Sequence, residues 1–131
     1  MHNSIIDWQG KLILVVEDDQ MNFNYIDILL KPTKAEVLHA ENGRKAVELC
    51  EKHPAINVVL MDIRLPVLNG LDATRQILAL RSGLPVIAQT AYAEEDDQKA
   101  AFNAGCCEFL AKPIRANEML DLIRKYIHSV S

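Results

Sequence analysis

The sequence has few cysteines, no long apolar run and no excess of basic residues, and each absence removes a class of function. Its three cysteines, Cys50 and the adjacent Cys106 and Cys107, are too few and too unevenly spaced for a disulfide framework or a zinc site. No apolar run approaches the roughly 20 residues of a membrane-spanning helix, and the first residues lack a signal-peptide pattern. The net charge of −4 argues against a nucleic-acid surface, which normally needs a basic face. We therefore expect a reduced, cytoplasmic chain that contacts neither membrane nor nucleic acid.

The remaining composition suits one compact α/β domain. The 131 residues, half of them apolar, provide for one core and leave no room for a second. Apolar runs of strand length alternate with segments of helical period. The predicted strands are Leu12–Val16, Ala35–His39, Val58–Met61, Leu84–Ala88 and Cys107–Ala111. A helix is expected after each strand, and the fourth helix covers 94–104. This alternation predicts a parallel, doubly wound sheet with right-handed crossovers.

Unequal polarity of the strands predicts their order. The second and fifth strands contain Glu36 and Glu108, whereas the other three could be covered by helices on both faces. Placing the two polar strands at the edges gives the order 2-1-3-4-5. The switch point then falls between strands one and three, where open α/β sheets bind their ligands.

Acidic residues end the two strands at that switch point. Glu17, Asp18 and Asp19 follow the first strand, and Asp62 closes the third. Like charges so close together raise one another's pKa unless a cation lies between them. Hard oxygen ligands without a nearby His or Cys favour Mg²⁺. The sequence therefore predicts an acidic site assisted by Mg²⁺.

The fourth and fifth strands add a hydroxyl and an amine at the same edge, from Thr90 and Lys112. Taken singly, each of these polar groups has a simpler role. Asp62 could cap a turn, and Asp19 is the best candidate to cap the first helix. Thr90 could bond to backbone, and Lys112 could be a solvated surface lysine. The topology brings the groups together, which favours one shared site.

Four separated motifs resemble the receiver domain of two-component response regulators. They are Ile13–Asp19, Leu60–Pro66 with Gly70, Pro85–Ala91 and Lys112-Pro113. The similarity covers about residues 11 to 128, so we interpret 11–131 as a receiver domain and 1–10 as a lead-in or linker. The resemblance is closest to receivers of hybrid histidine kinases. It implies a flavodoxin-like (βα)5 sandwich, at the cytoplasmic end of a membrane-bound sensor kinase if the parent is such a hybrid.

The resemblance also implies a chemistry for the acidic site. Asp62 would accept a phosphoryl group from the phosphohistidine of a partner and become 4-aspartylphosphate. The implied Mg²⁺ ligands are Asp18, Asp62 and the backbone carbonyl of Arg64, with Glu17 binding the ion through water. Lys112 would supply a second cation and Thr90 a hydroxyl donor, and the Lys112-Pro113 peptide is expected to be cis. The partner would be a kinase dimerisation and phosphohistidine domain, or a histidine phosphotransfer protein.

Receivers of this kind switch shape and lose their phosphate with time. The resemblance implies that Thr90 and Phe109 rearrange, changing the surface of the fourth helix, fifth strand and fifth helix; core packing is the alternative role of Phe109. Arg64 and Tyr92 would flank the path of attacking water, and their bulk predicts slow autodephosphorylation. Beyond this self-catalysed chemistry, the chain alone is not expected to be an enzyme.

Other functions are less compatible with the residues. A dehalogenase-type phosphatase normally needs a second Asp where Arg64 stands, and a flavodoxin-like electron carrier needs a hydroxyl-rich loop where Glu17, Asp18 and Asp19 stand. A degenerate receiver that acts as a phosphorylation-independent interaction module is the main alternative. The vicinal Cys106-Cys107 could be redox active, but we interpret both as small buried residues.

Overall fold

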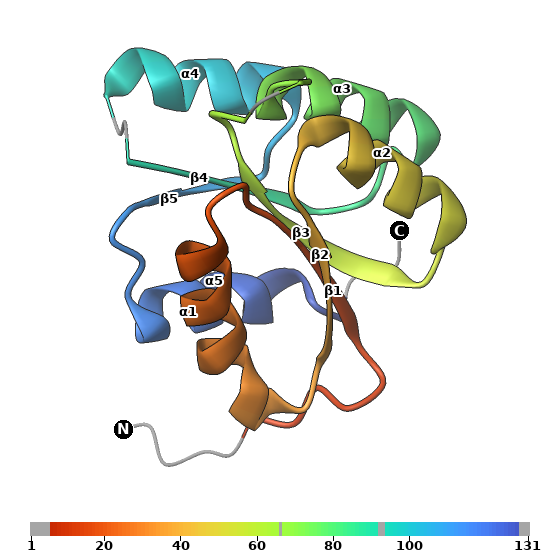
Figure 1. The fold of residues 1–131 in the computed structure, drawn as a ribbon, viewed down its shortest axis with the longest axis vertical. Helices are drawn as coiled ribbons and strands as arrows, with labels where there is room; N and C mark the ends of the chain where they lie inside the picture. The colour runs from red at the N-terminus through yellow and green to blue at the C-terminus, as the bar shows by residue number, and fades with distance from the viewer. Residues whose placement is uncertain (1–5, 66, 92–93, 129–131) are drawn as a thin grey trace.

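The computed structural model describes residues 6–65, 67–91 and 94–128 (Figure 1). Its strands are β1 (Leu12–Val16), β2 (Glu36–Ala40), β3 (Ile56–Asp62), β4 (Val86–Thr90) and β5 (Glu108–Ala111). Its helices are α1 (Gln20–Leu30), α2 (Gly43–Lys52), α3 (Gly70–Leu80), α4 (Glu95–Ala104) and α5 (Ala116–Tyr126), with a short 3₁₀ turn at Lys31–Thr33. The strands form one parallel sheet in the order β2-β1-β3-β4-β5, which confirms the predicted order and fold class.

Helices cover both faces of the sheet. Figure 1 shows α2, α3 and α4 on one face and α1 and α5 on the other. Each face has its own apolar cluster, one around Val59 and Met61 and the other around Val58 and Leu60. Because successive residues of a strand face opposite ways, β3 contributes to both clusters. Continuous burial of this kind, worth about 1.5–3 kcal/mol for each large side chain, makes β3 the centre of the domain.

Strand β4 begins and ends two residues later than the sequence predicted. Pro85 has no N–H to donate to a sheet ladder, so pairing begins at Val86. Gln89 and Thr90, which lie beyond the end of the predicted strand at Ala88, remain paired with β5 and are buried. The prediction ended too early because it followed side-chain polarity, whereas pairing of the backbone decides where a strand ends.

Side chains at the helix starts fix the loops around the sheet edge. The Asp19 carboxylate accepts hydrogen bonds from the backbone N–H groups of Met21 and Asn22, at 2.9 and 3.4 Å, which confirms its predicted role as a cap. Asn42 and Asn69 cap α2 and α3 in the same way. None of the described helices has the length and apolar character needed to cross a membrane.

The vicinal cysteines lie below the surface. Cys106 is buried and Cys107 is half-buried, and burial raises the pKa of both thiols, that of Cys106 to about 11. A thiol with a raised pKa stays protonated at neutral pH and is a poor nucleophile. This environment supports the interpretation of both residues as small core side chains.

Candidate functional site

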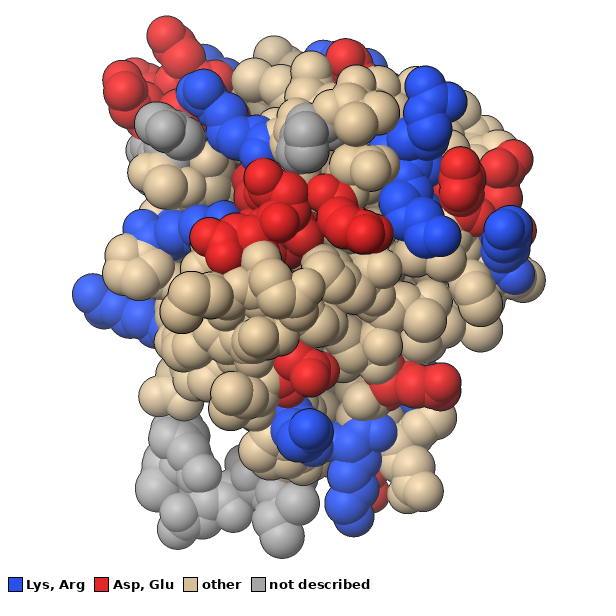
Figure 2. All heavy atoms as spheres, viewed as in Figure 1, with Lys and Arg blue, Asp and Glu red and all other residues tan. Residues whose placement is uncertain are grey.

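Three carboxylates meet where β1 and β3 end. Glu17, Asp18 and Asp62 each offer one oxygen, and these atoms all lie within 4.8 Å of one another. Glu17 and Asp62 are buried and Asp18 is exposed, so the cluster opens to solvent on one side. Figure 2 shows acidic side chains gathered at the centre of this face of the molecule, over the end of β1.

Lys112, just beyond β5, reaches across the sheet edge into the cluster. Its Nζ lies 2.9 Å from Glu17 Oε1 and 3.2 Å from Asp62 Oδ2. The Lys112-Pro113 peptide is cis, as the resemblance implied. A lysine that bridges two buried carboxylates is no solvated surface residue, so the simpler interpretation of Lys112 was wrong.

Burial and charge set the pKa values of this group of side chains. Desolvation raises the pKa of Glu17 and the charge of Asp62 raises it further, while hydrogen bonding to Lys112 opposes the rise. Burial alone would lower the pKa of Lys112, but its bonds to Glu17 and its attraction to both carboxylates outweigh burial, and the pKa rises. Two carboxylates share one ammonium, so part of their negative charge is uncompensated. A divalent cation would compensate it.

The donor set fits Mg²⁺. All the side-chain atoms of the cluster are hard carboxylate oxygens, and Mg²⁺ is bound by one or a few carboxylates together with water. The exposed side at Asp18 leaves room for water and for an oxygen of a substrate. The cluster of Glu17, Asp18 and Asp62 could therefore hold the predicted ion.

Backbone groups orient the acidic side chains. Asp62 Oδ1 accepts a hydrogen bond from the backbone N–H of Arg64 at 3.0 Å, and Glu17 Oε2 accepts one from Asp19 N–H at 3.2 Å. Asp62 therefore also forms the local turn that was its simpler interpretation, and the two roles coexist. Each carboxylate keeps its other oxygen for Lys112.

The backbone of α3 packs closely against Asp62. A Cβ atom at Gly70 would overlap the carbonyl oxygen of Asp62 and the Cα of Ile63. Glycine is the residue that allows two backbones to approach this closely. The Asn69-Gly70 pair therefore holds the start of α3 against the end of β3.

The other predicted site residues lie around the cluster in different ways. Thr90 is buried at the end of β4, on the strand next to Asp62. Phe109 is half-buried and packs on the cluster beneath α2, α3 and α4. Arg64 has an exposed side chain, and Tyr92 lies outside the described residues. The structure thus brings Glu17, Asp18, Asp62 and Lys112 into one group, while the roles assigned to these and to the other site residues stay predictions.

Three features near the site were not anticipated from the sequence. Arg64 Nη2 lies 3.3 Å from Asp97 Oδ1, which links the loop after β3 to α4. Because the two residues are far apart in the sequence, the pattern of neighbouring residues could not predict that they pair. Tyr25 donates a hydrogen bond of 2.7 Å from its hydroxyl to the carbonyl of Ile114, which joins α1 to the segment after β5.

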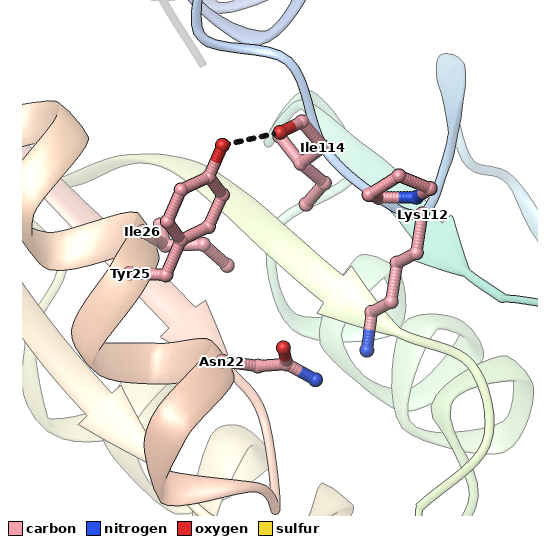
Figure 3. Close-up of a pocket in the computed structure, with 6 residues that line it drawn as sticks. Asn22, Tyr25, Ile26, Lys112 and Ile114 are labelled. Carbon is pink, nitrogen blue, oxygen red and sulfur yellow. Dashed lines mark hydrogen bonds between the residues drawn. The ribbon is translucent and has the colours of Figure 1, made fainter.

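That contact borders a small groove beside the acidic cluster. The groove is lined by Asn22, Tyr25, Ile26, Lys112, Pro113 and Ile114. In Figure 3 the side chains of Asn22 and Lys112 both extend into the space between α1 and the segment after β5. The groove therefore begins at the ammonium that holds the two buried acids.

The third feature is Gln89. Its side chain is fully buried, and neither amide atom has a hydrogen-bond partner among the residues that the structure describes. An unpaired buried polar group costs about 1–3 kcal/mol, so an amide in this place needs an explanation. The sequence carried a signal, because Gln89 interrupts an otherwise apolar strand, but the predicted strand ended before it.

Comparison with known proteins matches the acidic edge to one family. The family model for the response regulator receiver domain matches residues 13–124, which include Glu17, Asp18, Asp62 and Lys112. The chain belongs to the receiver family. The polar-differentiation response regulator DivK of Brucella anthropi is 32% identical over 120 residues, which cover 89% of this chain and 96% of DivK.

Solved receiver domains have the same fold. The receiver domain of the sensor histidine kinase PA1611 from Pseudomonas aeruginosa, solved with a magnesium ion in its active-site cleft, is 36% identical with a TM-score of 0.85, over 92% of this chain and 99% of that one. The receiver domain of yeast Ssk1, crystallised with the histidine phosphotransfer protein Ypd1, is 25% identical with a TM-score of 0.84, over 91% and 90% of the two chains. This chain is therefore a receiver domain of two-component signalling, and its acidic pocket suits Mg²⁺ and phosphorylation.

Proposed function

We propose that this receiver takes a phosphoryl group from a phosphohistidine onto Asp62. The observation that carries the proposal is the position of Lys112, whose Nζ bridges Glu17 and Asp62 at 2.9 and 3.2 Å beside the three-carboxylate cluster. Phosphoryl transfer requires that the nucleophile is aligned with the phosphoryl group and that the charge on the transferred oxygens is neutralised. A nucleophile, a cation and a metal-binding carboxylate cluster at one edge meet that requirement.

The transfer itself needs little from the protein beyond placement. A carboxylate oxygen of Asp62 attacks phosphorus, the new P–O bond forms as the P–N bond breaks, and the bonding electrons return to the imidazole nitrogen. Glu17, Asp18, Asp62 and the carbonyl of Arg64 would hold Mg²⁺, which supplies charge neutralisation when bound. Lys112 places a second positive charge next to the nucleophile, and Thr90 would donate a hydroxyl hydrogen bond from the neighbouring strand.

An exposed apolar stripe supports a helical phosphohistidine partner. Met21, Tyr25 and Ile28 of α1 are exposed large apolar residues spaced four and three positions apart, so they share one face of the helix. The stripe borders the groove at Lys112, and Figure 2 shows uncharged surface directly beside the acidic centre. An apolar face of this kind would accept a helix that presents its histidine to Asp62. The complex of Ypd1 with the Ssk1 receiver is an example of a receiver bound to a phosphotransfer protein.

Two settings for the domain have support. The similarity to the receiver domain of the sensor histidine kinase PA1611 supports the domain of a hybrid sensor kinase. We propose that such a parent would use the domain in a phosphorelay at the cytoplasmic side of a membrane. The matched region also accounts for 96% of DivK, which supports a free-standing regulator. In both settings the chemistry of Asp62 is the same, and the bulk of Arg64 and Tyr92 is expected to make autodephosphorylation slow.

Labelling with a small phosphodonor tests the proposal. The chain is incubated with radiolabelled acetyl phosphate, with Mg²⁺ or with EDTA, and the Asp62→Asn variant is treated in parallel. We expect label only in the wild-type chain with Mg²⁺. Label on Asp62→Asn would exclude Asp62 as the acceptor, and label in EDTA would exclude the metal's role. A folded wild-type chain that takes up no label would favour a phosphorylation-independent interaction module.

A further inference from the structure

The position of Gln89 relates it to Lys112. In the sheet register Gln89 lies between Asp62 of β3 and Leu110 of β5. Ile87 and Leu110 belong to the apolar cluster beneath α1 and α5, so alternation along β4 turns Gln89 toward that same face. The unpaired amide is therefore on the α1 side of the sheet, one strand away from the acceptor Asp62.

Lys112 crosses this region to reach its partners. It follows β5, and β4 lies between β5 and the strands that carry Asp62 and Glu17. It takes this route on the α1 side, because it lines the groove together with Asn22 and Ile26 of α1. On that face, Gln89 is the residue of β4 level with Asp62, so its amide belongs to the part of the sheet that the lysine spans.

We infer that Gln89 is a positioning residue for Lys112. Its side-chain amide gives the lysine ammonium a neutral hydrogen-bond acceptor during phosphoryl transfer. An ammonium has three N–H donors, and Glu17 and Asp62 take two of them. During transfer these carboxylates no longer serve only as acceptors for the ammonium, because Asp62 becomes the nucleophile and Glu17 is a proposed metal ligand. A turn of the Gln89 side chain would then give the ammonium an oxygen and would pair the buried amide.

The residue type fits this role. A leucine at position 89 would pack in the apolar cluster but would offer no acceptor. A glutamate would add a fourth carboxylate to a site that already holds three, and would raise their pKa values. Glutamine offers an acceptor without charge. The inference rests on the proposed function, because it concerns the lysine that serves the Asp62 reaction.

Four variants test the inference: Gln89→Leu, Gln89→Met, Lys112→Met and the double variant Gln89→Leu with Lys112→Met. Each is labelled with acetyl phosphate in Mg²⁺, and its Tm is measured without phosphodonor. We expect Gln89→Leu and Gln89→Met to raise Tm, because an unpaired buried amide is removed, and yet to slow labelling by about 10- to 100-fold, the contribution of one hydrogen bond to a charged group. In the Lys112→Met background, Gln89→Leu should leave the residual rate unchanged.

Each other result counts against the inference in a distinct way. If both Gln89 variants change Tm but label at the wild-type rate, Gln89 is a structural residue only. If Gln89→Leu slows labelling equally with and without Lys112, the amide does not act through the lysine. A wild-type chain without label would contradict the proposed function itself, and the role of Gln89 would fall with it.

Discussion

Lys112 Nζ lies 2.9 Å from Glu17 Oε1, although 95 residues separate the two side chains in sequence. The same nitrogen lies 3.2 Å from Asp62, so one ammonium compensates two buried carboxylates, one directly after β1 and one at the end of the neighbouring β3. This arrangement makes the stability of the domain depend on the same charges that are proposed to carry its chemistry.

The raised pKa of Glu17 predicts a pH dependence of folding in the absence of metal. An acid with a folded-state pKa above its unfolded value binds its proton more tightly in the folded protein. Stability is therefore lost as pH rises from the ordinary value of 4.5 through the raised one. Urea unfolding in EDTA across this pH range should show the loss in the wild type and a smaller loss in Glu17→Gln. The difference in unfolding free energy between the two proteins isolates Glu17, and a difference that is constant with pH would contradict the prediction.

Mg²⁺ is expected to stabilise the folded chain at neutral pH. Because the folded state gathers the three carboxylates, the ion should bind it and not the unfolded chain, adding about 2.7 kcal/mol at a hundredfold excess over Kd. Thermal melts with MgCl₂ and with EDTA measure the shift. Asp18→Asn should lose most of it, while Asp121→Asn, an exposed acid on α5, serves as the matched control and should keep it. Equal shifts in Asp18→Asn and the wild type would place the ion elsewhere.

Arg64→Ala is expected to shorten the life of the aspartyl phosphate several-fold with little change in stability. Its exposed pair with Asp97 contributes at most about 1 kcal/mol, but it holds a long side chain beside the acceptor loop. The half-life is measured after removal of acetyl phosphate. Arg75→Ala is the control, because it also removes an exposed Arg–Asp pair, the one with Asp72 on α3. An unchanged half-life in Arg64→Ala would remove Arg64 from the control of hydrolysis.

A charge on the α1 stripe should block transfer from a protein donor while sparing the site. Ile28→Glu and Met21→Glu change residues that are 65% and 79% exposed, so folding should be little affected. We expect transfer from a phosphorylated histidine phosphotransfer protein to fall at least about 30-fold, as for loss of a binding hot spot, with labelling by acetyl phosphate unchanged. Leu80→Glu, a 49% exposed residue on α3, is the control and should transfer normally. Equal effects of Leu80→Glu and Ile28→Glu would argue against α1 as the docking face.

Much of the fold could be predicted because its signals are local. Apolar runs of four or five residues identified five strands, and Glu36 and Glu108 marked the two edge strands, which gave the order of the sheet. Asp19 could be assigned as a helix cap because capping acts over two or three residues. The ends of β4 could not be predicted in this way. Whether Pro85 and the polar Gln89-Thr90 pair belong to the strand depends on backbone pairing with the neighbouring strands.

The sequence by itself determined which chemical groups stand at the edge of the sheet, because strand ends and residue types are properties of the chain: Glu17, Asp18, Asp62, Thr90 and Lys112. Only the tertiary structure decided how these groups share their charges, with Lys112 bridging two acids, Arg64 tied to α4 and Gln89 buried without a partner. Distances and desolvation depend on how the helices cover the sheet, and it is these that turn a set of polar residues into a site with a defined charge balance.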